Sequence, residues 1–147
     1  MIIAVDFDGT IVEHAYPRIG KPIPFAIETL LQLQAEGHTL LLWSVREGDL
    51  LQEAIDYCAS KGLTFYAANK NHPDEDPQKA SRKLNADIFI DDRNAGGLPD
   101  WGVIYNLIYD NDFSGNSLQR MMNEERHYPR RKRNFFIRLG EMFEKGY

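Results

Sequence analysis

The sequence has only one cysteine, Cys58, among its 147 residues. A single thiol excludes an intramolecular disulfide, so the chain has no feature that requires an oxidising compartment. Cys58 shares the apolar side of a predicted helix with Leu51, Ala54 and Ile55. We therefore expect a small buried side chain at this position and no nucleophilic thiol.

Long hydrophobic runs are also absent from the sequence. No apolar stretch approaches the roughly 18 residues that a membrane-spanning helix needs. The segment from Met1 to Asp6 reaches an acidic residue before any basic one, which is the reverse of a secretory signal. We therefore expect a cytoplasmic protein with no membrane partner.

Positive charge is scarce outside one segment of the chain. The sequence has 17 Lys and Arg against 22 Asp and Glu, a net charge of −5. Six of the 17 basic residues, and no acidic residue, lie between 126 and 138, so the rest has 11 basic against 22 acidic residues. This acidic body disfavours nucleic acid as a partner. The basic segment, which also contains aromatic residues, leaves nucleic acid open as a minor alternative.

The chain does show a regular alternation of short apolar runs and helical patterns. Apolar residues recur at helical spacing between 24 and 36 and between 49 and 60, and a glycine closes each segment. We expect strands over residues 1–6, 38–44, 63–67, 86–90 and 102–105. This order predicts an α/β fold with a doubly wound, mainly parallel, Rossmann-like sheet.

The alternation stops after Tyr105, so we predict a core over residues 1–110 and a C-terminal helical extension over 111–147. Within the extension, helices over 111–125 and 134–145 are expected to flank the basic segment 126–138. The second of these helices offers a broad apolar face, made of Phe135, Phe136, Leu139, Met142 and Phe143. We expect this face to form a homo-oligomer interface, with packing on its own domain as the alternative.

Two carboxylates, Asp6 and Asp8, follow the first predicted strand in the segment Asp-Phe-Asp-Gly-Thr. Gly9 permits a sharp turn there, because glycine carries no Cβ penalty at positive φ. One carboxylate of such a pair can attack a substrate while the other handles a proton, and the pair also suits Mg²⁺, which prefers oxygen ligands. The alternative is a solvated Asp-Gly turn.

A second acidic pair, Asp91 and Asp92, follows the strand predicted over 86–90. In parallel α/β sheets, ligands bind beyond the carboxyl ends of the strands. Two acidic pairs at that edge would repel each other strongly without a cation between them. A metal site therefore accounts for both pairs better than two separate solvated loops.

Ser44 ends the predicted second strand, and Arg46 lies two residues beyond it. A hydroxyl and nearby backbone N–H groups can hold a phosphoryl oxygen, and an arginine can add a bidentate contact. An N-cap role for Ser44 at the start of the following helix is an equally good interpretation.

Together these motifs resemble the haloacid dehalogenase superfamily in its phosphatase form. The segment from Asp6 to Thr10 matches the first motif, Asp-x-Asp-Gly-Thr, and Ser44 resembles the second motif. Lys83 resembles the lysine of the third motif, with Lys79 as its rival, and the pair Asp91-Asp92 resembles the acidic fourth motif. The resemblance covers roughly residues 1–105, with the four elements in the required order.

The resemblance implies a Mg²⁺-dependent phosphohydrolase in which Asp6 forms an aspartyl-phosphate and Asp8 acts as general acid and base. Lys83 would neutralise charge on the nucleophile and on the phosphoryl group. The implied metal ligands are Asp6, the backbone carbonyl of Asp8, Asp91 and, through water, Asp92. The implied phosphate-binding residues are Ser44, Arg46, Phe7, Gly9 and Thr10.

The resemblance also has one departure, which concerns the substrate. Larger members carry a cap domain, but segments 11–23 and 68–82 are too short for one, since an independent domain needs about 40 residues. We expect a capless phosphatase with an open site, acting on a phosphorylated small molecule or on the phosphorylated end of a larger substrate. A phosphotransferase of the same mechanism, or a non-catalytic phosphate-sensing or scaffolding module, is the alternative.

The four histidines show no spacing typical of metal ligands, and we assign none of them a catalytic role: His14, His38, His72 and His127. His14 is the nearest to the first motif. We interpret it as a solvated loop residue in preference to a substrate contact.

Overall fold

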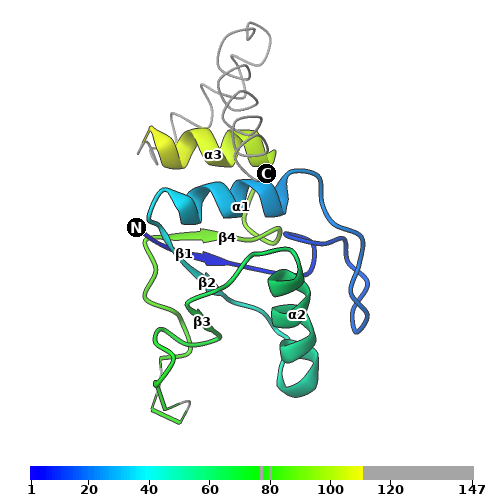
Figure 1. Cartoon of the computed structure of the whole chain (residues 1–147), viewed down its shortest axis with the longest axis vertical. Coiled ribbons are helices and arrows are strands. Elements are labelled where there is room, and N and C mark those ends of the chain that lie inside the picture. The colour runs from blue at the N-terminus through cyan, green and yellow to red at the C-terminus, as the bar shows by residue number, and fades with distance from the viewer. Residues whose placement is uncertain (77, 80, 111–147) are drawn as a thin grey trace, which may run out of the picture. The chain divides into compact units, whose positions relative to one another are not determined.

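The chain folds around a small parallel sheet (Figure 1). The computed structural model describes residues 1–76, 78–79 and 81–110. In chain order the elements are β1 (Ile2–Val5), α1 (Ala26–Ala35), β2 (Thr39–Leu42), α2 (Gly48–Ser60), β3 (Ala67–Ala68), β4 (Ile88–Ile90) and α3 (Trp101–Tyr109). This alternation of strands and helices confirms the predicted α/β class.

The strand β1 lies inside the sheet, whose order is β3-β2-β1-β4. Every pairing among these strands is parallel, and Val5 is in register with Leu42 of β2 and with Ile90 of β4. Three strands therefore end at the same level, so the residues that follow them emerge at one edge of the sheet. The predicted parallel sheet is confirmed, while its doubly wound arrangement stays a prediction.

The strand β1 is buried on both of its faces over residues 3–5. Ile3, Ala4 and Val5 of β1 have no exposed surface. Because successive side chains of a strand point to opposite faces, a continuous apolar run is what a strand covered on both sides requires. One face forms a core cluster that consists of Ala4, Leu41, Ala67 and Leu84.

The helices α1 and α2 bury an apolar stripe each. Leu30 and Leu33 are buried on α1, and Ala54 and Cys58 on α2. Burial raises the pKa of the Cys58 thiol to about 12, so the reactive thiolate does not form at neutral pH. The prediction of a buried cysteine is confirmed.

The strand predicted over 63–67 is shorter and begins later than expected, because β3 contains only Ala67 and Ala68. Leu63 belongs instead to the turn that closes α2, since its N–H donates to the carbonyl of Cys58 at 3.0 Å. Its apolar side chain is fully buried in that turn. Leu63 is therefore apolar because it is buried in a turn, and this explains why the sequence predicted a strand that began at residue 63.

The prediction of a fifth strand over 102–105 is wrong, because these residues lie in α3. Asp100 caps this helix by accepting a hydrogen bond from the N–H of Gly102 at 2.9 Å. Trp101, Ile104 and Ile108 are buried at a helical spacing. Short apolar runs are ambiguous between strand and helix, and here the cap and the 3.6-residue period decide for the helix.

The chain divides into two compact units at Leu98–Pro99, and β1 to β4 with α1 and α2 lie in the first unit. The predicted helices over 111–125 and 134–145, the basic segment 126–138 and the apolar face proposed for oligomerisation lie outside the described residues. In the part that is described, no helix is long and apolar enough to cross a membrane.

Candidate active site

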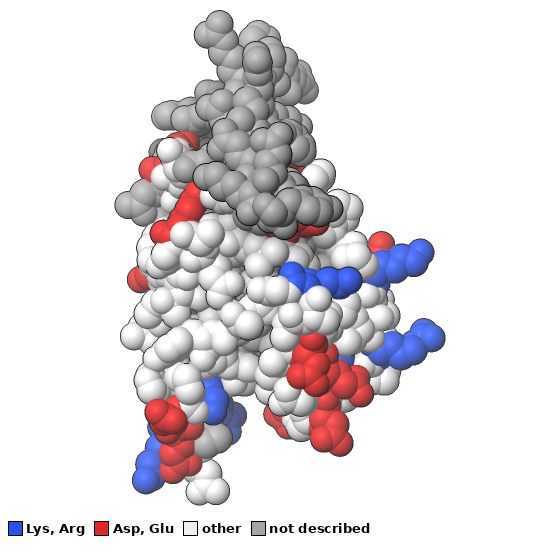
Figure 2. Space-filling model, viewed as in Figure 1, with Lys and Arg blue, Asp and Glu red and all other residues white. Residues whose placement is uncertain are grey.

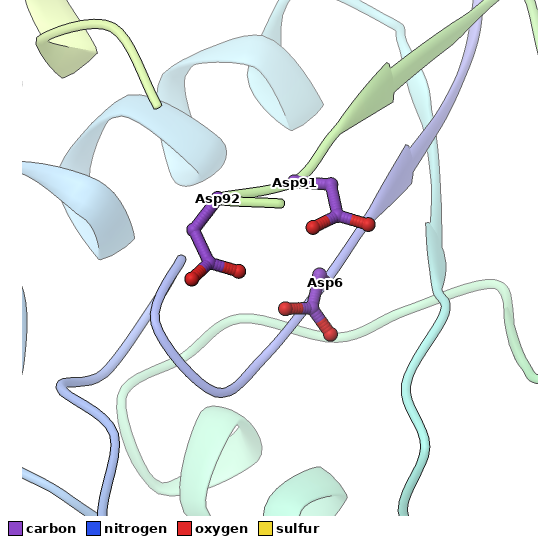
Figure 3. A group of neighbouring side chains, drawn as sticks. All are labelled: Asp6, Asp91 and Asp92. Carbon is purple, nitrogen blue, oxygen red and sulfur yellow. The ribbon is translucent and has the colours of Figure 1, made fainter. Parts of the chain in front are cut away.

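Three carboxylates meet where β1 and β4 end. Asp6 directly follows β1, and Asp91 and Asp92 directly follow β4. One oxygen from each of the three lies within 4.8 Å of the others. Figure 3 shows these carboxylates grouped beside the carboxyl ends of the two strands. The matched ends of neighbouring parallel strands thus bring together residues that are about 85 positions apart in the sequence.

The electrostatics of this acidic cluster (Asp6, Asp91 and Asp92) favour a cation. The pKa of Asp6 rises from 3.8 to about 6, chiefly because the carboxyl group is partly buried. A backbone hydrogen bond from Phe7 lowers the pKa, and repulsion from Asp91, Asp92 and Asp8 raises it. In addition, Oδ1 of Asp92 is buried with no hydrogen-bond partner among the described residues. A buried oxygen without a partner, beside like charges, fits a hard cation with oxygen ligands such as Mg²⁺.

The turn after β1 holds the acidic cluster in place through Gly9 and Thr10. Gly9 has φ +93, and a Cβ there would lie 2.4 Å from Nε2 of His14 and 2.5 Å from Oδ2 of Asp92. Thr10 is buried; its Oγ1 accepts from the N–H of Asp92 at 3.0 Å and donates to Oδ2 of Asp6 at 3.4 Å. The close approach of the two acidic loops therefore requires a residue without a side chain at position 9.

Asp8 occupies a different environment from Asp6, although only Phe7 separates them. Both of its oxygens accept hydrogen bonds from Arg46: Oδ2 from Nε at 2.6 Å and Oδ1 from Nη2 at 2.7 Å. The Arg46 side chain has no exposed surface, and that of Asp8 is 6% exposed. Asp8 is therefore a buried carboxylate in a bidentate ion pair, and its side chain lies outside the acidic cluster.

Arg46 is fully buried and donates four side-chain hydrogen bonds within the protein, while its predicted contact with phosphate stays a prediction. It also donates from Nη1 to the carbonyl of Pro17 at 2.9 Å and from Nη2 to that of Arg18 at 2.8 Å. Its guanidinium carbon lies 5.1 Å from the centre of the Phe7 ring. With these donors occupied and the side chain fully buried, Arg46 fastens the loop of residues 16–18 to Asp8. Phe7 is likewise a buried core residue.

Ser44 lines the same cavity as Asp6, and its predicted contact with a phosphoryl oxygen stays a prediction. Its backbone N–H donates to Oδ1 of Asn69 at 2.8 Å, and Nδ2 of Asn69 donates to the carbonyl of Arg46 at 3.0 Å. Asn69 has φ 53, a left-handed conformation that asparagine adopts more readily than most residues. The sequence analysis did not select Asn69. The signal that could have identified it is an asparagine directly after β3, which ends at the same sheet edge as β2.

A cavity of about 340 Å³ opens over the acidic cluster, and its wall includes several residues that the sequence analysis did not select. The lining residues are Asp6, Asp8, His14, Tyr16, Trp43, Ser44, Val45, Asp91 and Arg93. His14 is more than a solvated loop residue, because its Nε2 lies 2.9 Å from Oδ2 of Asp92. Tyr16 and Trp43 add aromatic surface to the wall.

The two candidate lysines lie away from the cavity wall. Nζ of Lys83 lies 5.3 Å from the centre of the Phe89 ring, and Nζ of Lys79 lies 3.6 Å from a carboxylate oxygen of Asp76. Neither lysine belongs to the described residues that line the cavity. The predicted roles of Lys83 and Lys79 therefore stay predictions.

Comparison with solved structures gives one strong match. It is described as the structure of a conserved protein coded by a locus from Bacteroides thetaiotaomicron, with 67% sequence identity and a TM-score of 0.72. The alignment covers 76% of this chain and 92% of that one. No protein-family model and no curated protein sequence matches the chain.

Proposed function

We propose a hydrolytic function for this chain, which belongs to the same family as the conserved protein from Bacteroides thetaiotaomicron. In this proposal it is a Mg²⁺-dependent phosphomonoesterase that resembles the haloacid dehalogenase superfamily and works through an aspartyl-phosphate. The observation that carries the proposal is the acidic cluster, in which Asp6 meets Asp91 and Asp92 within 4.8 Å at the end of two parallel strands.

Three groups of the acidic cluster are suited to hold the metal: the carboxylates of Asp6, Asp91 and Asp92. The buried Oδ1 of Asp92, which has no hydrogen-bond partner among the described residues, supports this assignment. Bound there, Mg²⁺ would draw negative charge from the phosphoryl oxygens and so lower the repulsion between the phosphate ester and an attacking carboxylate.

Asp6 is the proposed nucleophile. An oxygen of its carboxylate forms a bond to phosphorus while the bond to the ester oxygen breaks, which gives an aspartyl-phosphate and the alcohol. In the second step a water oxygen attacks phosphorus, and the aspartate is released together with inorganic phosphate. The partial burial that raises the pKa of Asp6 also removes water from its oxygens, which makes the carboxylate a better nucleophile.

Asp8 is the proposed proton carrier. It lines the cavity beside Asp6, and its carboxylate as held by Arg46 can accept the proton of the attacking water in the second step. Arg46 donates one hydrogen bond to each oxygen, so Asp8 would take up and deliver the proton through a lone pair that these bonds leave free. Arg46 is therefore a positioning residue in this proposal, and Ser44, after the neighbouring strand β2, is a phosphoryl contact.

The proposal is tested with Asp6→Asn on a generic aryl phosphate in the presence of Mg²⁺. An amide does not attack phosphorus, so we expect hydrolysis to fall to the background rate. Asp56→Asn is the matched control, because Asp56 is an exposed aspartate on α2 that accepts a hydrogen bond from Gln52 and lies outside the cavity. Full activity in Asp6→Asn would rule out the proposed nucleophile.

A further inference from the structure

Part of the cavity wall is aromatic and apolar. Tyr16 is 55% exposed and Val45 is 74% exposed, and both line the cavity together with Trp43. Exposed large apolar side chains are usually scattered over a protein surface as single residues. Here several of them line one cavity beside the proposed nucleophile. Exposed apolar surface at this place would be covered when a ligand enters.

Both rings are held from behind by other side chains of the protein. The guanidinium carbon of Arg46, itself fixed by four hydrogen bonds, lies 5.4 Å from the centre of the Tyr16 ring. The Phe89 ring meets Trp43 edge-on, with ring centres 4.9 Å apart and an angle of 67° between the planes. Because these rings are already supported, a ligand that stacks on them does not have to order them first.

We propose that the substrate is a phosphate monoester that carries a planar aromatic ring, and this proposal rests on the proposed phosphatase activity. The phosphate group would lie at Asp6 and Ser44, and the ring would lie against Tyr16 and Trp43. Planar rings stack on aromatic side chains regardless of their substituents. A bare sugar has no such face, and the apolar wall offers few partners for its hydroxyl groups.

The surroundings of the cavity favour a small molecule over the end of a nucleic acid chain. The volume of about 340 Å³ lies at the lower end of the range of about 300–1,000 Å³ for small-molecule sites. The helix α2 begins just after Val45, and acidic side chains gather over it in Figure 2. The exposed acidic residues of α2 are Asp49, Glu53 and Asp56, and Glu47 precedes the helix as its N-cap. This charge repels the successive phosphates of a polynucleotide.

The test compares two substrates that differ only by the ring, adenosine 5′-monophosphate and ribose 5-phosphate, with phenyl phosphate as a ring without a sugar. We expect kcat/KM for the nucleotide to exceed that for the sugar phosphate by about tenfold, the scale of one stacked base. Tyr16→Leu should remove most of this preference, and Tyr16→Phe should keep it. Tyr66→Leu is the matched control, because Tyr66 is 48% exposed and lies outside the cavity.

The ratio between the two substrates separates stacking from indirect damage. If Tyr16→Leu disturbs Arg46 and Asp8, both substrates lose rate equally and the wild-type ratio persists, which contradicts the proposed ring contact. Equal hydrolysis of nucleotide and sugar phosphate by the wild type overturns the ring proposal and leaves the phosphatase proposal standing. Preference for phenyl phosphate together with the nucleotide supports a general ring site, whereas hydrolysis only of a 5′-phosphorylated oligonucleotide overturns the choice of a small substrate.

A binding measurement covers the case in which no substrate is hydrolysed, which would overturn the proposed function itself. Calorimetric titration of the Asp6→Asn protein with adenosine 5′-monophosphate and with ribose 5-phosphate, both with Mg²⁺ present, then decides the ring site alone. Tighter binding of the nucleotide by about tenfold, lost in the additional variant Tyr16→Leu, supports it. Equal binding of the two compounds, or no binding of either, overturns it.

Discussion

Asp6 and Asp8 are two aspartates of one short turn, and their surroundings are opposite. Asp6 belongs to the acidic cluster, where burial and neighbouring carboxylates raise its pKa to about 6. Asp8 is equally a cavity residue, yet both of its oxygens are bound by the buried guanidinium of Arg46. Among the described residues no ion pair reaches Asp6, whereas Nε of Arg46 lies 2.6 Å from Oδ2 of Asp8.

This difference shows how one turn can divide two tasks between two identical side chains. A carboxylate without a compensating cation is a place where a metal ion or a developing bond can add stability. A carboxylate in a bidentate buried pair is fixed in position by its two hydrogen bonds. The predictions below remove one side of the comparison at a time.

The largest effect on stability is expected from Arg46→Met, which leaves Asp8 buried without its partner. Breaking a buried ion pair in this way costs about 3–5 kcal/mol of the free energy of unfolding. Urea denaturation measures it, with Arg93→Met as control because Arg93 is exposed and should change stability little. The double variant Asp8→Leu with Arg46→Met should recover part of the loss. A stability of Arg46→Met equal to that of the wild type would contradict the structural role given to this pair.

A smaller effect of opposite sign is expected from Asp6→Asn in the protein without Mg²⁺. The folded pKa of Asp6, about 6, lies above its ordinary value of 3.8, so the folded state binds the proton more tightly. Stability of the wild type therefore falls as the pH rises from about 4 to 6, and asparagine avoids this loss. With allowance for solvent screening, we expect Asp6→Asn to be more stable by on the order of 2 kcal/mol at pH 8.

The pH profile is the sharper part of this test. The advantage of Asp6→Asn over the wild type should shrink toward pH 4, as the folded state and then the unfolded state of the wild type take up the proton. Thermal unfolding between pH 4 and pH 8 in the presence of a chelator gives the profile. A constant difference across this range would mean that Asp6 does not carry the uncompensated charge.

The smallest effect is expected from adding Mg²⁺ to the wild type. A ligand at ten times its dissociation constant stabilises a protein by about 1.4 kcal/mol, which a rise in Tm reports. The rise should be present at pH 7.5 and weaker at pH 5, because protons compete for Asp6 below a pKa of about 6. Asp91→Asn should weaken the response, whereas Asp87→Asn, outside the acidic cluster, should retain it. Equal responses of these two variants would argue against the metal site.

Much of the acidic cluster was predictable because it depends on local signals. An apolar run followed directly by aspartates marks the end of a buried strand, and this occurs at Val5-Asp6 and at Ile90-Asp91. Parallel strands with matched ends then bring the aspartates together. The wrong prediction of a strand over 102–105 also came from a local signal, because a short apolar run suits a strand and a helix alike. The capping residue Asp100 was the feature that indicated a helix.

The sequence by itself determined the α/β class, the buried Cys58 and the two acidic strand ends, because each depends on the order of apolar and polar residues along the chain. Only the tertiary structure decided that Arg46 binds Asp8, 38 positions away, and that Tyr16 and Trp43 share one cavity wall. An arginine after a strand can serve a phosphate or a carboxylate equally well. Which one it meets depends on how the loop of residues 16–18 packs over the strand end, and no local periodicity encodes that packing.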